Sequence, residues 1–462
     1  LGFPWFLLGH TQIRLPAMIQ IADLTGVYGV SFVVAMVNGL LAELVLRRMG
    51  RRAGTAPAGP VPAWTALVVG TVAAVQLYGW YRLAQTDARP GPRIAVLQGD
   101  FELHPRPVPG RPPATDEQKR ELYFELFRQA AAGQPDLVVF PETPWSMVLN
   151  REIREIHRNT ALLESMSHER ARQSLLAGLA GQRHHERLRD LSARHRTAIV
   201  IGSLSEEPQP DGVYPPEHRY NSAFVYRPDH EEPQRYDKIH LVPFGEAIPF
   251  RYSRRLFWLY RFLNDGPWNP WGGKDFEHTL TAGTAFRTFE IPAPSLNGHD
   301  HRFGVTICYE DVIPEVFRRF VVEGSGPKRV DFMLNISNDG WFGHGSQQPQ
   351  HLVNCAFRAI ENRVGIARAV NTGVSGFVDS TGRWHDLVVE PGRGPHAGGT
   401  GQRTARVAVD PRVTLYSRYG DVFASLCGLA ALAAGLDAVT LRWRQRRTRL
   451  AAPEGPRPGG AS

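Results

Sequence analysis

Three long apolar stretches stand out in the pattern of hydrophobic and polar positions along the chain. Residues 24–42 and 63–81 each run for 19 residues without a formal charge, and residues 422–441 carry one, Asp437. Because an α-helix rises about 1.5 Å per residue, such a stretch covers about 28 Å, close to the ~30 Å hydrocarbon thickness of a bilayer. The alternative, a buried core helix, rarely lacks charges over this length. The pattern therefore predicts three transmembrane helices.

Arginine clusters beside these stretches predict their orientation. One cluster lies between the first two stretches and a second follows the third, and the positive-inside rule places both in the cytoplasm. The spans then run outward-to-inward, inward-to-outward and outward-to-inward, which leaves the segment between Tyr81 and Tyr419 outside the cytoplasm. The cluster residues are Arg47, Arg48, Arg51 and Arg52, then Arg442, Arg444, Arg446, Arg447 and Arg449.

Between the second and third spans, short apolar runs alternate with helical patterns, which favours α/β layers. Helices are expected at 116–132, after the capping pattern Thr115-x-x-Gln118, and at 350–363. Strands are expected at 94–98, 136–140, 198–203, 222–226, 303–308, 331–336, 366–371 and 374–378. The predicted organisation is a membrane part over residues 1–84, an extracytoplasmic domain over 93–415, a C-terminal transmembrane helix over 420–442 and a basic cytoplasmic tail over 443–462.

Two stretches differ from this alternation. Residues 151–196 are helix-rich and dense in Arg, Glu and His, and we interpret them as a solvated excursion from the α/β core. Residues 257–276 (FWLYRFLNDGPWNPWGGKDF) form an aromatic loop, which either packs on the domain or contacts lipid or substrate, since Trp and Tyr favour the membrane interface.

Composition narrows the possible classes of protein. With 42% hydrophobic residues the chain can build a core, and 3 Cys in 462 residues do not form a disulfide scaffold. The net charge of +8 is largely a topology signal, so we expect no nucleic-acid partner. We find no C-x-x-C, P-loop or H-E-x-x-H pattern, and interpret His184-His185 and His299-x-His301 as solvated loop residues; no cofactor and no metal are expected.

Three residues at the ends of apolar runs are candidates for chemistry. Taken singly, Cys308 would be a small buried hydrophobe, Glu142 a surface acid and Lys238 an exposed cation. Together they supply a nucleophile, a base to take its proton, and a cation that stabilises a tetrahedral oxyanion. A fourth acid, Glu246 or Glu310, would hold the lysine in place.

The motifs around these residues resemble a known family. PET (141–143), YDKIHLVPFGE (236–246) and ICYED (307–311) are similar to the carbon–nitrogen hydrolase (nitrilase) superfamily. The fuller set resembles the apolipoprotein N-acyltransferase family within it. That set adds GFPW (2–5), GVYGVSF (26–32), NISNDGWFG (335–343), RAIENR (358–363) and NTGVSG (371–376).

The resemblance implies an αββα nitrilase-like sandwich anchored by transmembrane helices. It implies transfer of an acyl chain from a membrane phospholipid to the N-terminal α-amine of a diacylglyceryl-modified apolipoprotein, by a ping-pong route through a thioester. Cys308 would be the nucleophile, Glu142 the general base and Lys238 the oxyanion-stabilising cation. Glu246, Glu310, Tyr309 and Trp341 would be supporting residues. The enzyme would be a monomer in the bacterial inner membrane, with its catalytic domain on the periplasmic side.

The sequence departs from the family in two respects. No Trp occurs in 99–113, where the family often has one, which leaves one wall of the acyl site undefined. The chain also has fewer spans than the family and begins at Leu1 on apolar residues. We therefore expect a fragment that lacks upstream membrane helices.

Three other functions fit part of the pattern. A membrane-tethered amidase that hydrolyses small amides would use the same three residues. A catalytically inactive relative would serve as a membrane scaffold. A thiol-protease-like site would pair Cys308 with His240 or His351.

Overall fold

The computed structural model describes most of the chain. The described residues are 4–52, 61–101, 113–210, 217–266, 279–296, 298–324, 326–342, 345–390, 392 and 398–451. The chain divides into two compact units, one up to Gly420 and one from Asp421 onward.

Two six-stranded mixed sheets form the centre of the first unit. In order, the first contains β12 (Gly401–Val409), β1 (Arg89–Gln98), β2 (Leu137–Val139), β3 (Ala198–Glu207), β4 (His218–Tyr226) and β5 (Gln234–Asp237). The second contains β11 (Trp384–His385), β10 (Gly376–Val378), β9 (Gly365–Val370), β8 (Phe332–Ser337), β7 (His299–Ile307) and β6 (Thr288–Ala293). The central strands β1, β2 and β3 are parallel, as are β7, β8 and β9.

The residues of β1 show how the sheets are layered. Ile94 and Val96 point into an apolar core shared with the second sheet, whereas Ala95 and Leu97 point into a core shared with helices. Alternate residues of a strand face opposite sides, so a strand apolar at every position is covered on both faces. The structure confirms the predicted sandwich of two sheets between helical layers.

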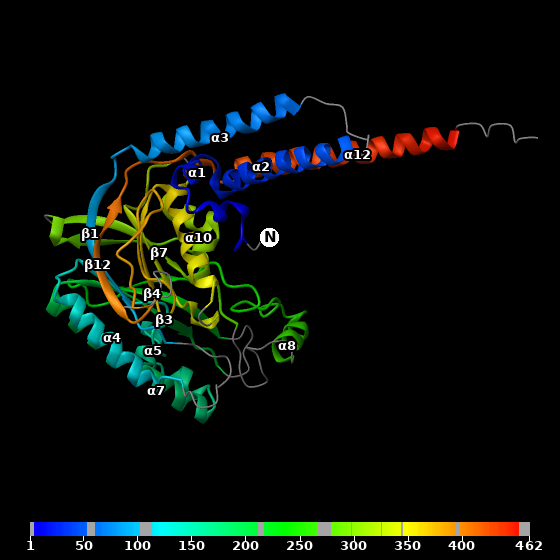
Figure 1. The fold of residues 1–462 in the computed structure, drawn as a ribbon. Coiled ribbons are helices and arrows are strands. Elements are labelled where there is room, and N and C mark those ends of the chain that lie inside the picture. Colours follow the sequence, from blue (N-terminus) through cyan, green and yellow to red (C-terminus); the bar gives the residue numbers. More distant parts are fainter. Residues whose placement is uncertain are drawn as a thin grey trace, which may run out of the picture. The chain divides into compact units, whose positions relative to one another are not determined.

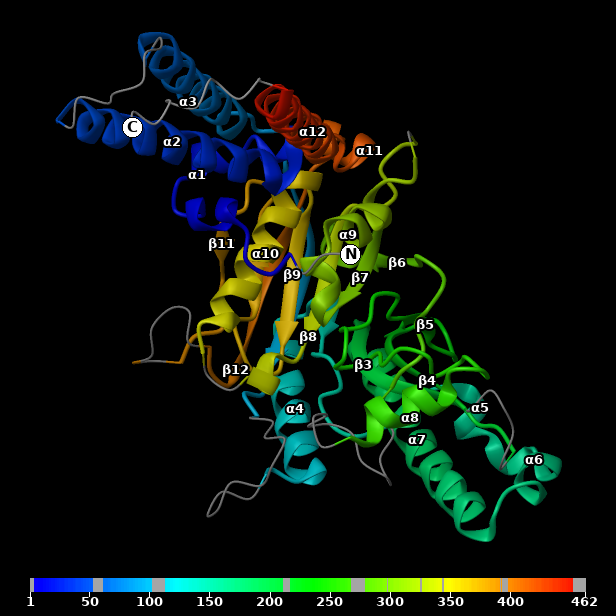
Figure 2. The same cartoon turned by 90° about the vertical axis from the view of Figure 1, so that its right-hand side faces the viewer.

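Helices cover the outer faces of both sheets (Figures 1 and 2). The helices α4 (Asp116–Ala131) and α7 (His168–His195) pack on the first sheet, and α9 (Pro314–Val321) and α10 (Gln347–Asn362) pack on the second. Thr115 caps α4 by accepting a hydrogen bond from the amide of Gln118 at 3.2 Å, as the capping pattern predicted.

The interpretation of residues 151–196 as a solvated excursion is wrong for their second half. In α7, Leu188 is fully buried, and His185 and Leu191 are nearly so, because this part of the helix covers the first sheet. The interpretation of His184-His185 as solvated loop residues is therefore also wrong, since both lie within α7 and His185 is buried. The Arg and Glu residues of α7 lie on its outer face. Because they dominate the composition of the segment, its narrow apolar face was not recognised from the sequence. The preceding segments are α5 (Arg151–Arg154), a 3-10 turn (Ile156–Arg158) and α6 (Thr160–Glu164).

The aromatic stretch 257–276 is partly helical. Its first residues form α8 (Phe257–Asp265), in which Tyr260 is fully buried while Trp258 and Phe262 are exposed. The expected loop beyond residue 266 lies outside the described residues, as do most of residues 99–113, where the expected Trp is missing from the sequence.

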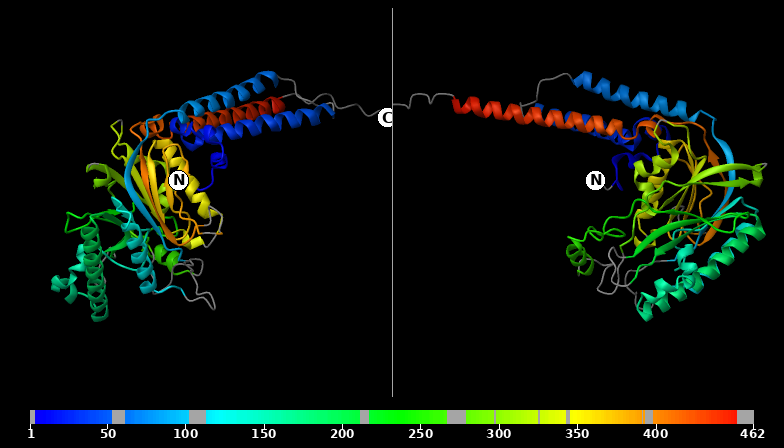
Figure 3. Two further views of the ribbon diagram at one scale, coloured as in Figure 1. Left: turned by 60° about the vertical axis from the view of Figure 1, so that its left-hand side comes forward. Right: turned by 180° about the vertical axis from the view of Figure 1, so that it is seen from behind.

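Three helices of the described chain are long and apolar enough to cross a membrane. They are Ala22–Gly50 within α2 (Ala22–Arg52), Pro62–Leu83 within α3 (Val61–Leu83), and Val422–Trp443 within α12 (Val422–Ala451). Each contains one of the predicted spans. Figure 3 shows α2 and α3, in blue, extending from the same end of the sandwich. Before α2, a 3-10 turn (Leu8–Gln12) and α1 (Pro16–Ile19) pack beside these helices.

Buried polar contacts join α2 to the end of α10. Asp23 accepts hydrogen bonds from Arg363 at 2.6 Å and from Arg82 at 2.7 Å. Gly26 has φ 67° and interrupts the helix, which frees the amide of Val27 to donate to Glu361 at 2.9 Å. A side chain at Gly26 would also collide with the Tyr416 ring of α11 (Leu415–Tyr419), so this kink requires glycine.

Candidate active site

Glu142 lies just past the carboxyl end of β2. The strand is fully buried, and Phe140 and Pro141 carry the chain to Glu142, which is 6% exposed. The turn packs directly on β3 at Gly202, where an added Cβ would lie 2.6 Å from the Cα of Glu142. The absence of a side chain at Gly202 therefore lets the backbone of the Glu142 turn lie directly against β3.

Lys238 follows β5 and its side chain is fully buried. Its ammonium lies 2.9 Å from Oε1 and 2.8 Å from Oε2 of Glu246, and 3.7 Å from Oε1 of Glu142. The amide of Val242 donates to Glu246 at 2.9 Å, which holds this carboxylate against the lysine. The two acids thus lie around one cation.

Asn221 on β4 bridges the two acids. Its Nδ2 donates to Oε1 of Glu142 at 2.6 Å and to Oε1 of Glu246 at 3.1 Å. Oε2 of Glu142 is buried and has no hydrogen-bond partner among the residues that the structure describes. A buried acceptor without a partner is costly, so this oxygen is a candidate to accept a proton or a hydrogen bond from a reacting group.

Cys308 begins a 3-10 turn (Cys308–Val312) that follows β7, and the turn replaces the last residue of the expected strand. Its side chain is partly exposed, and its φ of 52° lies in the left-handed region. A residue other than glycine in this conformation is strained, and such strain clusters at functional sites.

Glu310 ties the Cys308 turn to the lysine segment. One oxygen accepts from the amide of Ile307 at 2.8 Å, and the other accepts from Tyr236 Oη at 2.7 Å and from the amides of Ile239 at 2.7 Å and His240 at 3.1 Å. The carboxyl group therefore fixes the backbone on both sides of the site. Burial raises the pKa of Glu310 to about 7, although these hydrogen bonds oppose the shift.

The cluster carries one more negative charge than positive when both acids are ionised. Burial raises the pKa of the Glu142 carboxyl, with the charge of Glu246 adding to the effect and Lys238 opposing it. Burial also acts to raise the pKa of Glu246, yet Lys238 and three hydrogen bonds lower it below its usual value. Lys238 stays protonated, because Glu246, Cys308 and Glu142 outweigh the cost of burying its charge and raise its pKa.

The thiol of Cys308 belongs to the same electrostatic cluster. Burial and the charge of Glu142 raise its pKa well above the usual value, and Lys238 opposes them. A raised thiol pKa favours the protonated thiol, so attack by the sulfur requires a base that takes its proton, and Glu142 is the acid whose charge acts most strongly on Cys308.

Tyr309 and Trp341 lie at the edges of this cluster. The Tyr309 ring is buried between Trp5, at a centroid distance of 6.3 Å, and His240, at 5.8 Å. Trp341 is 40% exposed in the 3-10 turn Asp339–Phe342. The structure thus brings Glu142, Lys238, Glu246 and Glu310 together directly, with Tyr309 beside them and Trp341 nearer the surface.

The geometry disfavours the Cys–His alternative. Both ring nitrogens of His351 are occupied, Nε2 by Asp311 at 2.7 Å and Nδ1 by Asp339 at 2.9 Å. Burial and the charge of Lys238 lower the pKa of His240, whose ring stacks on Tyr309.

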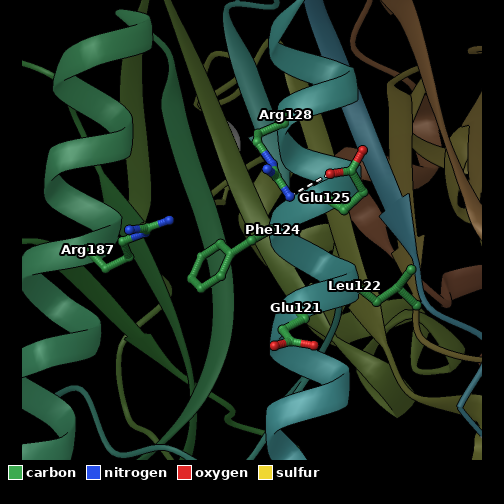
Figure 4. Close-up of a pocket in the computed structure, with 6 residues that line it drawn as sticks. All are labelled: Glu121, Leu122, Phe124, Glu125, Arg128 and Arg187. Carbon is green, nitrogen blue, oxygen red and sulfur yellow. Dashed lines mark ion pairs between the residues drawn. The ribbon is translucent and has the colours of Figure 1, made fainter.

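A surface cavity of about 560 Å³ between α4 and α7 contains none of these residues (Figure 4). Its lining is Glu121, Leu122, Phe124, Glu125, Arg128 and Arg187. Arg128 pairs with Glu125 at 2.5 Å, and the Arg187 guanidinium lies 5.2 Å from the centre of the Phe124 ring. Among the described residues, no group of three or more His, Cys, Asp or Glu is placed to hold a metal.

Several site residues were not found from the sequence. Asn221 lies in the polar first half of β4, next to Ser222 and before most of the apolar run that predicted this strand. Asp311 and Asp339 lie inside the quoted motifs ICYED and NISNDGWFG, which gave them no role of their own. The sequence around Asn221 gave no signal that its side chain would be buried, at 4% exposure, between two acids.

Comparison with known proteins identifies the family. The carbon–nitrogen hydrolase family model matches residues 93–394, and the model of the apolipoprotein N-acyltransferase N-terminal domain matches residues 1–40. An apolipoprotein N-acyltransferase of Geobacter metallireducens is 31% identical over 94% of this chain and 70% of its own length. One of Chlorobaculum tepidum is 27% identical over 95% of this chain and 73% of its own length.

An amidase from Nesterenkonia sp. of known structure is 16% identical, with a TM-score of 0.41 over 73% of this chain and 97% of its own. The sequence relatives and the two family models agree along the chain, from the first membrane helix through the two sheets. The chain belongs to the apolipoprotein N-acyltransferase family, a membrane-anchored branch of the carbon–nitrogen hydrolases.

Proposed function

We propose that this chain transfers an acyl chain from a membrane phospholipid to the N-terminal α-amine of a diacylglyceryl-modified apolipoprotein, through a thioester on Cys308. The observation that carries the proposal is the buried Oε2 of Glu142, which has no hydrogen-bond partner among the described residues, in a carboxyl group that lies 3.7 Å from the Lys238 ammonium and acts electrostatically on the Cys308 thiol. Family membership supports the class of substrate.

In the first half-reaction Glu142 takes the thiol proton as the sulfur of Cys308 attacks the ester carbonyl carbon of the phospholipid. The carbonyl oxygen becomes an oxyanion, which the Lys238 ammonium stabilises. Collapse breaks the carbon–oxygen ester bond, and Glu142 returns its proton to the departing lysophospholipid alkoxide. The acyl chain is then held as a thioester.

In the second half-reaction the lipoprotein amine attacks the thioester carbonyl, and Glu142 takes the amine proton. The carbon–sulfur bond breaks, an amide forms, and the proton returns to the Cys308 thiolate. A water-poor site beside the lipid favours the amine over water as the second nucleophile. Glu246 and Asn221 orient Lys238 and Glu142, and Glu310 fixes the Cys308 turn; these three are positioning residues.

The proposal includes the membrane setting predicted from the charges. The catalytic domain lies on the periplasmic side of the inner membrane, with Arg47 and Arg48 at the cytoplasmic end of α2. An acyl donor that stays in the lipid phase explains why the soluble domain lies between membrane helices in the chain.

The test is mass spectrometry of the purified protein after incubation with a phospholipid that carries an alkyne-tagged acyl chain. We expect the tag on the Cys308 peptide, and we expect a synthetic lipopeptide with a free diacylglyceryl-cysteine amine to remove it. Cys308→Ser should lose the tag. Cys427→Ser is the control, because Cys427 lies in α12, outside the unit that contains the site, and it should keep the tag.

The amidase alternative predicts a different outcome in the same assay. It requires release of ammonia from small amides, with no tag on Cys308 and no transfer to the lipopeptide. That result would overturn the acyltransferase proposal while leaving the three residues in their chemical roles.

A further inference from the structure

A closed ring of four buried charges lies behind the Cys308 turn. His351 contacts Asp311 at 2.7 Å and Asp339 at 2.9 Å, and Arg368 contacts the same two acids at 3.2 Å and 2.9 Å. Each cation therefore bridges both anions. All four side chains are at most 4% exposed, so none of these charges is balanced by solvent.

The ring joins four elements that are far apart in the sequence. Asp311 belongs to the Cys308 turn, Asp339 follows β8, His351 is on α10 and Arg368 is on β9. A buried charge without a partner is strongly destabilising, so the ring requires all four groups together. With His351 protonated, its two positive and two negative charges balance.

Two connections lead from the ring to the nucleophile. Asp311 is three residues after Cys308 within the same turn. On the other side, Arg368 donates to Oδ1 of Asn335, and Nδ2 of Asn335 lies 3.5 Å from the carbonyl oxygen of Cys308. Helix α10 also holds the end of the turn, because Arg358 donates to the carbonyl of Val312 at 3.3 Å.

The ring is also within electrostatic range of the thiol. The charge of Asp339 raises the pKa of Cys308, and the charge of Arg368 interacts favourably with the thiolate. The other charged groups that face Cys308 are Glu142, Lys238 and Glu246, from the first sheet and the loop after it. The thiol is therefore subject to two groups of charges, the ring and the group formed by Glu142, Lys238 and Glu246. The proposed acyl transfer uses only the second group.

We propose that His351, Asp311, Asp339 and Arg368 are positioning residues for the nucleophile, which hold the strained Cys308 turn and keep the buried charge behind the thiol neutral. The inference rests on the proposed role of Cys308. Loss of one cation leaves a net negative charge behind the sulfur and disfavours the thiolate. Loss of one anion leaves a net positive charge and favours it.

The expected changes in thiolate formation have opposite signs for loss of a cation and loss of an anion. A purely structural role predicts no such difference, so this difference provides the test. The rate of Cys308 alkylation by iodoacetamide is measured by peptide mass spectrometry on the full-length protein between pH 6 and 7.5, where the wild-type His351, with its pKa raised to about 9, is protonated. We expect His351→Asn to lower the rate and Asp311→Asn to raise it. Each unit by which the thiol pKa moves changes the thiolate fraction about tenfold at pH values below the pKa.

Matched controls separate positioning from general destabilisation. His185→Asn and Asp136→Asn remove a buried histidine and a buried carboxylate from the same domain, away from the Cys308 turn. They should leave alkylation unchanged. Thioester formation should fall by about 10²-fold in both ring variants, since a misplaced nucleophile loses its alignment.

Two outcomes overturn the proposal: shifts of the same sign in the His351 and Asp311 variants, or changes no larger than those of the controls. If either variant fails to fold, Asp339→Asn replaces Asp311→Asn and Arg368→Gln replaces His351→Asn, with the same expected signs. Alkylation of Cys308 needs no lipid. If acyl transfer fails but the alkylation rates of the two variants still change in opposite directions, the proposed function is wrong and the positioning role of the ring is retained.

Discussion

At the scale of single residues, the two oxygens of Glu142 have different surroundings. Oε1 accepts from Asn221 at 2.6 Å and faces Lys238, whereas Oε2 is buried and finds no partner in the part of the chain that the structure describes. The first oxygen fixes the carboxylate and the second is left to accept a proton. A glutamine at this position can still accept the hydrogen bond from Asn221, but its amide cannot act as a base.

Glu142→Gln is therefore expected to fold normally and to lose acylation of Cys308. General-base catalysis contributes about 10²–10⁴-fold, so thioester formation should fall by at least about 10²-fold. The measurement is the rate of tag incorporation from the alkyne-tagged phospholipid. Glu290→Gln, an exposed acid on β6, is the control for the substitution itself. Substantial retention of activity would favour a histidine as the base.

The buried ring has a predictable dependence on pH. The acids that face His351 raise its pKa to about 9 from the usual 6.5, although burial and Arg368 oppose them. A group with a raised folded-state pKa stabilises fully below its unfolded pKa and loses that stability as pH rises through the folded value. The contribution, on the order of 3 kcal/mol, is therefore present below pH 6.5 and lost as pH rises through about 9.

Thermal unfolding in detergent at pH 6 and at pH 9.5 measures this effect. We expect the Tm of the wild type to fall between the two values by clearly more than that of His351→Asn, which has no group to titrate here. Equal falls in the two proteins would show that the stability of the ring does not depend on the imidazolium.

Part of the candidate site was predictable from single residues, because a polar residue next to an apolar run is unusual. Glu142, Lys238 and Cys308 lie at strand ends next to apolar runs, where a polar residue is conspicuous. Lys238 shows the limit of the approach: a lone Lys is usually exposed, and only the fold shows two acids around it. Arg368 was missed because its partners come from three other elements.

At the scale of elements, the position of a strand in its sheet decided whether it was predicted. The eight interior strands, β1 to β4 and β7 to β10, were all found from apolar runs. The four missed strands, β5, β6, β11 and β12, are the edges of the two sheets. An edge strand is covered on fewer sides and therefore carries polar positions, as the mixed burial of β12 shows.

The contact between β3 and the Glu142 turn gives a prediction at this scale. In Gly202→Ala, the new Cβ would lie 2.6 Å from the Cα of Glu142 and 2.7 Å from the amide of Thr143, both backbone atoms that cannot move aside cheaply. We expect the turn to shift and thioester formation to fall about 10²-fold.

The control for this substitution is Gly428→Ala on α12, where an added Cβ meets nothing within 4 Å. It should leave thioester formation unchanged. A Gly202→Ala protein that acylates Cys308 at the wild-type rate would contradict the idea that this backbone contact sets the carboxylate position.

At the scale of the whole molecule, the first unit combines two of the three membrane helices, α2 and α3, with the two-sheet sandwich. Asp23 at the start of α2 pairs with Arg363 and Arg82, and α10 extends from this junction to His351 beside the Cys308 turn. The sequence indicated the spans by length and charge alone. It could not indicate that helix α10 links them to the site, since that requires contacts between residues 340 positions apart.

Membrane orientation is the last prediction, and it concerns the whole chain. If the arginine clusters are cytoplasmic, Glu231→Cys, at an exposed position of the catalytic domain, should react with a membrane-impermeant maleimide in intact spheroplasts. Arg48→Cys, near the C-terminal end of α2 and therefore predicted to be cytoplasmic, should react only after the membrane is permeabilised. Both variants are made in a Cys308→Ser, Cys427→Ser background, because these two partly exposed native thiols would add to the signal. The reverse labelling pattern would place the site in the cytoplasm, away from exported lipoproteins, and would exclude the proposed substrate.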